Sequence, residues 1–296
     1  MKQEITVALA GNPNSGKTSL FNALTGLNHK VSNFPGTTVD KKVGYCKLTS
    51  EIKAQIIDLP GTYSLYPKST DELVTYDILR NKAETDFPDL VLFIADASNL
   101  KRNLLLLTQV ADLGVPVILA LNMVDLAERK GIFYDMDVLS ETLNIPVVSI
   151  NARNKKGIDQ IKKLIANQSL HKKNTYLSLD NIDTKLLDEI CEITDKKNAY
   201  AALQYAINVS SFATNRAKQV NAVFEKHNFK SKNFQENEIL KRYHLIDEAV
   251  RAGKKERISS NTSRVGNCLV FKHFVFSVSS NFFVERIPYA VGRAWV

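Results

Sequence analysis

The feature that most constrains this chain is a short glycine-bounded turn near its N-terminus. Residues 11–18 read Gly-Asn-Pro-Asn-Ser-Gly-Lys-Thr, between an apolar strand-like run (5–10) and a helical pattern (18–24). Glycines let successive backbone N–H groups point inward, and the N-terminus of the new helix faces the same point. A strand, such a turn and a helix together predict a phosphate-binding loop, with Lys17 on the β- and γ-phosphates and the Thr18 hydroxyl on Mg²⁺.

Strand-like and helical runs alternate up to residue 168. The strand candidates are residues 5–10, 53–57, 90–95, 115–121 and 145–149. The helical candidates include residues 70–82, 99–113, 135–143 and 157–166. Residues 41–50 are expected to add an antiparallel edge strand. This alternation predicts one α/β domain over residues 1–168, with a mixed, mainly parallel sheet and helices on both faces.

Beyond residue 168 no strand pattern returns. Residues 169–182 are polar and aperiodic, as in a linker. Apolar residues then recur at helical spacing, at Leu186, Leu187, Ile190 and Ile193, at Ala217, Val220 and Phe224, and at Ile239, Tyr243, Ile246 and Val250. Gly253 stands where a helix C-cap would fall. We therefore predict a small all-α helical bundle over residues 183–256, followed by an atypical basic tail at 257–296.

The net charge of +8 is concentrated at the C-terminus, because residues 251–296 hold eight Lys and Arg but only two Glu. The rest of the chain is nearly neutral, so we expect no nucleic-acid partner. Three scattered cysteines without a CxxC pair, and no secretory signal, favour a reduced cytoplasmic protein. The five histidines are scattered and suggest no metal cluster.

Two further motifs stand in the order that a guanine-nucleotide switch requires. Residues 33–38 read Asn-Phe-Pro-Gly-Thr-Thr, where a threonine can close over the γ-phosphate and offer its hydroxyl to Mg²⁺. We expect Thr38 in this role, with Thr37 as the alternative. Residues 58–61 read Asp-Leu-Pro-Gly after a strand candidate. Asp58 can hold a Mg²⁺-bound water, and the Gly61 N–H can sense the γ-phosphate.

Two more motifs predict that the nucleotide base is guanine. Residues 122–125 read Asn-Met-Val-Asp, and the Asp125 carboxylate can accept hydrogen bonds from N1–H and N2–H₂ of guanine. Adenine would leave that carboxylate unpaired, and a site of this type can discriminate between the two bases by a factor of ~10⁴. Residues 149–153 read Ser-Ile-Asn-Ala-Arg, where a backbone N–H commonly reads guanine O6. The predicted GTP-binding residues are Gly11, Asn12, Pro13, Asn14, Ser15, Gly16, Lys17, Thr18, Ser19, Gly36, Thr37, Thr38, Asp58, Leu59, Pro60, Gly61, Asn122, Met123, Asp125, Asn151, Ala152 and Arg153.

The runs 11–18, 36–42, 58–65 and 122–125 together resemble the cytosolic part of ferrous iron transport protein B. The most specific marks are Asp-Leu-Pro-Gly-Thr-Tyr-Ser-Leu at 58–65 and Asn-Met-Val-Asp, with Met where most GTPases have Lys. The resemblance spans residues 1–256. It implies a Ras-like P-loop fold, GTP hydrolysis coupled to Fe²⁺ uptake, and a helical domain that inhibits GDP dissociation. It also implies a membrane domain as partner at the bacterial inner membrane, and homo-oligomers through the cytosolic domains.

Three residues set expectations for turnover. Met123 replaces the lysine that flanks the base, so we expect fast nucleotide exchange. Thr62 stands where Ras-like enzymes have a water-orienting glutamine, so intrinsic hydrolysis should be slow. In related GTPases an asparagine at the position of Asn14 helps to hold K⁺ where an arginine finger would otherwise act, although Asn14 could also only shape the turn. The predicted catalytic set is therefore Lys17, Thr38, Gly61 and Asn14.

An Era-like ribosome-assembly GTPase that binds RNA is the alternative. It would need a GxxG loop or a basic, aromatic sheet after residue 170, and neither is present before 256. In the tail, the apolar run 268–284 contains Lys272 and His273. A central lysine costs ~2.5–3.5 kcal/mol on insertion, so we expect this chain alone to be soluble.

Overall fold

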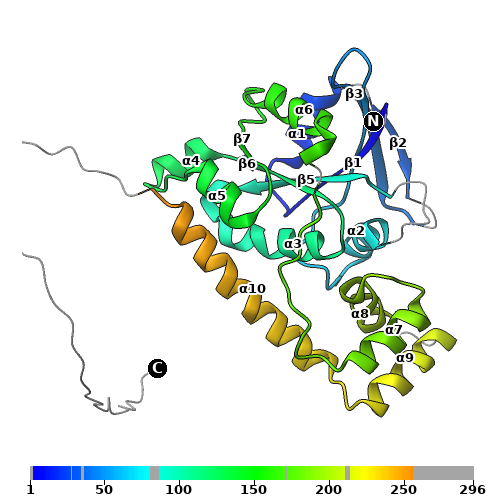
Figure 1. Cartoon of the computed structure of the whole chain (residues 1–296). Coiled ribbons are helices and arrows are strands. Elements are labelled where there is room, and N and C mark those ends of the chain that lie inside the picture. The colour runs from blue at the N-terminus through cyan, green and yellow to red at the C-terminus, as the bar shows by residue number, and fades with distance from the viewer. Residues whose placement is uncertain are drawn as a thin grey trace, which may run out of the picture. The chain divides into compact units, whose positions relative to one another are not determined.

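The computed structural model describes residues 3–27, 29–34, 37–80, 87–170, 172–210 and 214–255. Within these ranges seven strands form one sheet, in the order β2-β3-β4-β1-β5-β6-β7 (Figure 1). The parallel strands are β1 (Glu4–Gly11), β4 (Lys53–Asp58), β5 (Leu90–Asp96), β6 (Val117–Asn122) and β7 (Val147–Ser149). β2 (His29–Asn33) and β3 (Asp40–Lys47) are antiparallel. The predicted mixed, mainly parallel sheet is confirmed.

Helices cover both faces of the sheet. α1 (Lys17–Thr25) and α6 (Ile158–Ala166) pack on one face. α2 (Thr70–Arg80), α3 (Leu100–Asp112) and α5 (Met136–Leu143) pack on the other. Side chains alternate between the faces along β1, so Val7 and Leu9 join the α1 side while Ala8 and Ala10 join the α3 side. Shorter helices are η1 (Ala97–Asn99), α4 (Val124–Arg129) and η2 (Gln168–Leu170).

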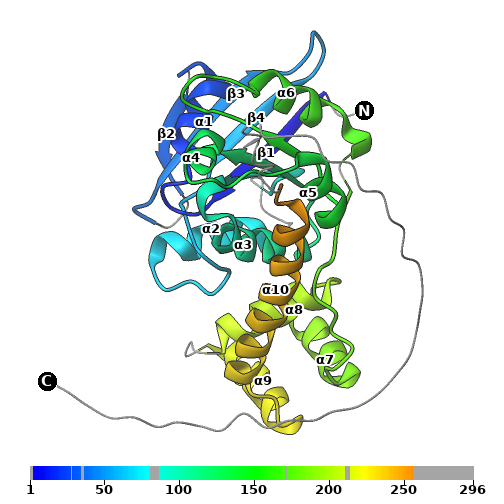
Figure 2. The ribbon, with the colours of Figure 1, turned by 90° about the vertical axis from the view of Figure 1, so that its left-hand side faces the viewer.

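In the described part of the chain after residue 183 there are four helices: α7 (Thr184–Thr194), α8 (Ala199–Val209), α9 (Asn215–Lys226) and α10 (Ser231–Gly253). The side chains of Asp183, Asn198 and Thr214 cap the first three by accepting backbone N–H bonds. α10 leaves the other three and runs along α3 and α5 (Figure 2). Its end is fixed where Asp135 N donates to Gly253 O (2.8 Å) and Lys255 N donates to Phe133 O (2.9 Å).

The sheet edge differs from the prediction. Residues 41–50 were expected to form the edge, but β3 pairs with β4 on one side and with β2 on the other. β2 was not foreseen because five mostly polar residues carry no clear alternation. Two strands also begin later than expected, after Pro116 and Pro146, which have no N–H to donate.

The buried face of α10 also differs from the predicted stripe. Ile239 is half-buried and Tyr243 is exposed, whereas Glu238 and Arg242 are 1% and 2% exposed. Over this part of α10 the buried face is shifted by one residue, because these two charged side chains find partners inside the protein. Ile246 and Val250 are buried as predicted. Gly253 is not a left-handed cap: it is the last residue of α10, and an added Cβ would lie 2.4 Å from Leu139 Cδ2.

No helix among the residues with described positions is long and apolar enough to cross a membrane. The tail predicted at 257–296, with its apolar run 268–284, lies outside the described residues.

Candidate functional site

The sequence motifs come from the carboxyl ends of neighbouring strands. β1 ends at Gly11, β4 at Asp58, β6 at Asn122 and β7 at Ser149. The register places Leu9 beside Asp58, and Leu121 beside Ser149. Because parallel strands end at the same edge, the phosphate, switch and base motifs all meet there, where open α/β sheets bind ligands.

The phosphate loop has a backbone that requires its residue types. Asn14 (φ 65°) and Gly16 (φ 95°) are left-handed. A Cβ on Gly16 would lie 2.2 Å from Asn122 Nδ2, and one on Gly11 would lie 2.4 Å from Ile94 O. Side chains are therefore excluded at both glycines. A hollow of about 460 Å³ is lined by Asn12, Pro13, Asn14, Gly16, Lys17, Thr18, Ser19 and Gly61.

Lys17 and Asp58 form an ion pair between Lys17 Nζ and Asp58 Oδ1. Their side chains are 14% and 7% exposed, so the pair is largely buried. The Thr18 side chain is exposed at the mouth of the same loop. A carboxylate and a hydroxyl are oxygen donors, which suit Mg²⁺. The residues present therefore fit the ion that the sequence predicts.

In the first switch loop, the motif at residues 33–38, the two threonines have different surroundings. Thr37 Oγ1 donates to Phe34 O (3.1 Å) and accepts from Val39 N (3.2 Å). Phe34 is buried and anchors this turn. The Thr38 side chain is exposed. Local bonds thus occupy the Thr37 hydroxyl and leave that of Thr38 facing solvent. Gly36 lies outside the described residues.

The second switch loop, residues 59–66 after β4, lies directly against the phosphate loop. A Cβ on Gly61 would be 3.1 Å from Pro13 N, so only glycine fits without displacement. Pro60 O accepts a hydrogen bond from Thr75 Oγ1 (2.8 Å). Thr62 is 1% exposed and its hydroxyl donates to Ser64 O (2.9 Å), so it faces the protein rather than the site.

Leu59 was included among the predicted GTP-binding residues, but its side chain is fully buried in the core below the sheet edge. Its backbone N–H donates to Leu9 O (3.1 Å). The side chain therefore packs and does not reach the hollow.

Asn122 joins the phosphate loop to the last loop. Its Nδ2 donates to Ser15 O (3.0 Å) and its Oδ1 accepts from Ala152 N (3.2 Å). Asn151 Oδ1 accepts from Asn154 N (3.1 Å) and shapes the same turn. The amide N–H of Ala152 is therefore engaged by Asn122.

Met123 and Asp125 flank the start of α4. Met123 is left-handed (φ 59°), and its methyl lies beside Gly16 of the phosphate loop. The side chains of Asp125 and Arg153 are exposed. A base would have to cover Asp125 to give the selectivity expected from the sequence.

Sequence reasoning missed Arg102 of α3. Its guanidinium stacks 4.0 Å from the ring centroid of Tyr63, directly after Thr62. Its carbonyl oxygen accepts a hydrogen bond from Asn12 Nδ2 (3.4 Å). One residue of α3 thus touches both the phosphate loop and the second switch loop. No local pattern in the sequence signals this contact.

A buried polar cluster ties the second switch loop to the helices that follow the sheet. Tyr66 OH and Gln204 Nε2 donate to Glu238 Oε2, the latter at 3.1 Å. Tyr200 OH (2.6 Å) and Arg242 Nε (2.8 Å) donate to Glu238 Oε1. Burial, with the Glu238 carboxylate beside it, raises the pKa of Tyr66, so its hydroxyl stays protonated and donates.

The cluster continues into α3. Arg242 Nη2 lies 2.6 Å from Asp112 Oδ2. Asp112 also accepts from the backbone N–H groups of Tyr176 (2.5 Å) and Leu177 (3.2 Å), in the segment between the sheet and α7. The spacing of Glu238 and Arg242, four residues apart on one helix, was the available signal for this cluster.

Comparisons with known proteins agree on one family. The family model described as ferrous iron transport protein B matches residues 5–165. The Fe(2+) transporter FeoB of Leptospira biflexa is 40% identical over 175 residues, which is 59% of this chain and 25% of that protein. FeoB of Escherichia coli K12 is 40% identical over 187 residues, 63% of this chain and 24% of that protein. The chain thus spans about a quarter of the length of these curated relatives.

Solved structures give the same result over more of the chain. The cytosolic domain of L. pneumophila FeoB is 32% identical with a TM-score of 0.69, and the match covers 85% of this chain and 100% of that one. The cytosolic domain of T. maritima FeoB in its GMPPNP form is 29% identical with a TM-score of 0.68 and the same coverage. These matches do not favour the RNA-binding Era-like alternative.

Proposed function

The chain belongs to the ferrous iron transport protein B family, and we propose that it is the GTP-binding and GTP-hydrolysing region of a ferrous iron transporter. The observation that carries the proposal is the meeting of the phosphate loop, both switch loops and Asp125 at one sheet edge. Fe²⁺ would be moved by the membrane part of the full-length protein, on whose cytoplasmic side this region would act. Self-association through the cytosolic domains is part of the same proposal.

The residues divide the work as follows. The loop N–H groups and Lys17 bind the phosphates, while Thr18 and, through water, Asp58 hold Mg²⁺, which when bound offsets phosphate charge. Thr38 and the Gly61 N–H sense the γ-phosphate. Because the Thr62 hydroxyl is turned into the protein, no side chain at that position orients the attacking water, and intrinsic hydrolysis is slow.

Base selectivity tests the proposal most directly. Asp125→Asn replaces an acceptor with a donor facing N1–H and N2–H₂, so GTP affinity should fall roughly 10²–10³-fold. Xanthine, with an acceptor at position 2, should then be preferred. Affinities for GTP and XTP are measured by fluorescence competition. Asp137→Asn, an exposed aspartate on α5, is the matched control. Unchanged GTP binding in Asp125→Asn would show that Asp125 does not recognise the guanine base.

Turnover is proposed to be stimulated by K⁺, held in part by the Asn14 side-chain oxygen. A fixed positive charge beside the leaving phosphate acts as an arginine finger does, and a finger contributes ~10³–10⁵ in rate. A monovalent ion should give less, on the order of 10-fold. GTP turnover in KCl and NaCl is compared for the parent and Asn14→Gly, since glycine tolerates the left-handed backbone at this position. Equal rates in both salts for the parent would remove K⁺ from the mechanism.

The helical region is proposed to slow GDP release. Met123 favours fast exchange, and the helices can oppose it through the second switch loop. Support comes from the hydrogen bond that Tyr66 OH donates to Glu238 of α10 and from the bond that Asn208 Nδ2 of α8 donates to Leu65 O (3.4 Å). For GDP to leave, the second switch loop must then break these buried hydrogen bonds in addition to its own contacts with the nucleotide.

A further inference from the structure

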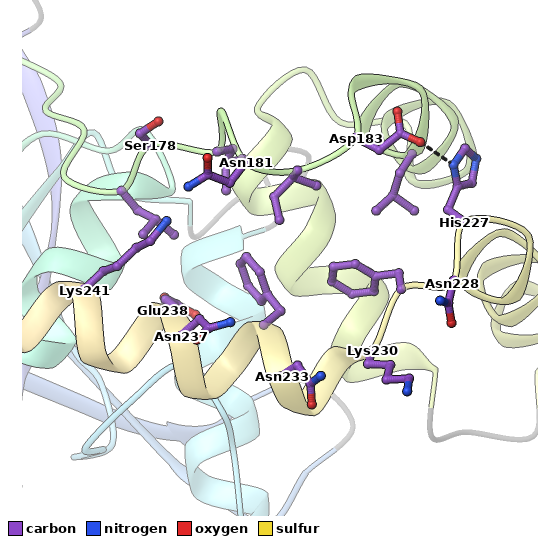
Figure 3. A pocket seen from close by; sticks show the side chains of 16 residues that line it. Ser178, Asn181, Asp183, His227, Asn228, Lys230, Asn233, Asn237, Glu238 and Lys241 are labelled. Carbon is purple, nitrogen blue, oxygen red and sulfur yellow. Dashed lines mark hydrogen bonds and ion pairs between the residues drawn. The ribbon is translucent and has the colours of Figure 1, made fainter.

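A groove of about 700 Å³ lies between residues 177–183 and the α9–α10 turn (Figure 3). None of its lining residues belongs to the GTP-binding motifs. Its floor is apolar, with Leu177, Leu186 and Phe234 buried and Phe229 half-buried. The Phe229 ring centroid is 5.8 Å from that of Phe234. The floor can therefore accept apolar side chains.

The rim of the groove is rich in carboxamides. The side chains of Asn181, Asn228, Asn233 and Asn237 are exposed, and none of them has a hydrogen-bond partner in the described part of the chain. A carboxamide offers both donors and an acceptor, so it can pair with a peptide group. The rim is thus suited to hydrogen-bond a polypeptide backbone.

The spacing along α10 supports an extended occupant. Asn233, Asn237 and Lys241 follow one another at four-residue intervals on the groove side of the helix (Figure 3). Four helical residues rise about 6 Å, and two residues of an extended chain rise about 6.6 Å. Successive side chains of this row can therefore meet every second residue of an extended peptide.

The charge of the rim is positive. Lys230 and Lys241 are exposed, and neither has an ion-pair partner among the residues described. Asp183 is engaged by His227, whose Nδ1 lies 2.7 Å from Asp183 Oδ2. The Glu238 carboxylate is buried and bonded on both oxygens. The two lysines therefore determine which charge the groove attracts.

We propose that this groove binds an extended peptide segment of a partner protein, with apolar side chains at alternate positions and acidic side chains between them. The apolar side chains lie over Phe229 and Phe234. The carboxamides of Asn233 and Asn237 bond the peptide backbone, and Lys230 and Lys241 pair with the carboxylates.

The test uses the whole 296-residue chain and a fluorescein-labelled peptide, Asp-Leu-Asp-Phe-Asp-Leu-Asp. Fluorescence anisotropy should give a Kd of about 10–100 μM, and at least tenfold weaker binding for the same peptide with Lys in place of Asp. A backbone N-methylated acidic peptide should also bind at least tenfold more weakly, because methylation removes the peptide N–H groups that would donate to the asparagine side-chain oxygens. Lys241→Glu should weaken binding at least tenfold.

The matched control is Lys218→Glu, which makes the same charge change at an exposed position of α9 outside the groove. It should bind the acidic peptide as the parent does. The proposal is overturned if the parent does not bind at 1 mM, if the acidic and basic peptides bind equally, or if Lys241→Glu and Lys218→Glu behave alike. Undiminished binding of the N-methylated peptide would also overturn it, because the groove would then recognise an apolar body and not a peptide backbone.

Discussion

At the residue scale, His227 shows how three side chains fix the turn between α9 and α10. Its Nδ1 lies 2.7 Å from Asp183 Oδ2 and its Nε2 lies 3.2 Å from Glu189 Oε1. The hydrogen bond to Asp183, then that to Glu189, raises the pKa of His227. The pKa values of both carboxyls are lowered, Asp183 mainly by His227, and Glu189 mainly by Lys226 and then by His227.

These shifts predict a pH dependence of stability. A raised His227 pKa stabilises the fold below the unfolded value of 6.5, and this contribution is lost as pH rises through the folded pKa. The lowered pKa values of Asp183 and Glu189 stabilise the fold above pH 3.8 and pH 4.5, respectively. This stability is lost as the pH falls through the folded pKa values. The difference in Tm between the parent and His227→Gln should therefore be larger near pH 5.5 than near pH 8.5. Gln219→Asn, a change between two neutral side chains at an exposed position of α9, should show no such trend. A difference in Tm between the parent and His227→Gln that grows as the pH rises would contradict the stabilising role of protonated His227.

At the element scale, the end of α10 depends on close approach to α5. An added Cβ on Gly253 would lie 2.4 Å from Leu139 Cδ2 and 2.6 Å from Cγ, and Leu139 is fully buried. Because Leu139 is buried, its side chain can give way only by moving against other core atoms. Gly253 therefore serves packing rather than helix termination.

Gly253→Ala is predicted to destabilise the protein in spite of better helix propensity. Alanine favours the helix by about 1 kcal/mol over glycine. Overpacking costs about 1–3 kcal/mol, so the free energy of unfolding should fall by about 1 kcal/mol. Urea unfolding of Gly253→Ala, Leu139→Ala and the double variant gives the coupling. Strictly additive effects would show that the two side chains do not compete for space.

At the scale of the whole molecule, the GTP-binding part and the helical region share one polar core. Glu238 of α10 accepts from Tyr66 of the second switch loop and from Tyr200 of α8. Only the first of these bonds joins the two regions. The two tyrosines therefore form a matched pair for testing the proposed slowing of GDP release.

Tyr66→Phe is predicted to release a fluorescent GDP analogue roughly 3- to 10-fold faster, because one buried bond to a charged group is lost. Tyr200→Phe removes a bond to the same carboxylate within the helical region and should leave release near the parent rate. Stopped-flow displacement by excess GDP measures both. If Tyr66→Phe releases the analogue at the parent rate, the helical region does not slow GDP release through this hydrogen bond.

Much of the fold and of the candidate site could be predicted from local patterns. The phosphate loop is encoded by contiguous residues. Gly11 and Gly16 act through backbone geometry, the new helix contributes its N-terminal charge, and Lys17 follows with its side-chain ammonium. Alternating strands and helices indicated the sheet, since residues buried on both faces form apolar runs. Asp58, Gly61 and Asp125 could be named because each lies at the end of a parallel strand or within three residues of it, and parallel strands end at one edge.

Other features were decided only by tertiary structure. The charged buried face of α10 exists because Glu238 and Arg242 meet Tyr66, Tyr200 and Asp112 from distant segments. A hydrophobic-periodicity argument places apolar residues inside and cannot foresee partners that neutralise a buried charge. The sequence by itself determined the backbone that holds a nucleotide, because that information is local; which side chains couple it to the helices depended on contacts between segments far apart in the chain.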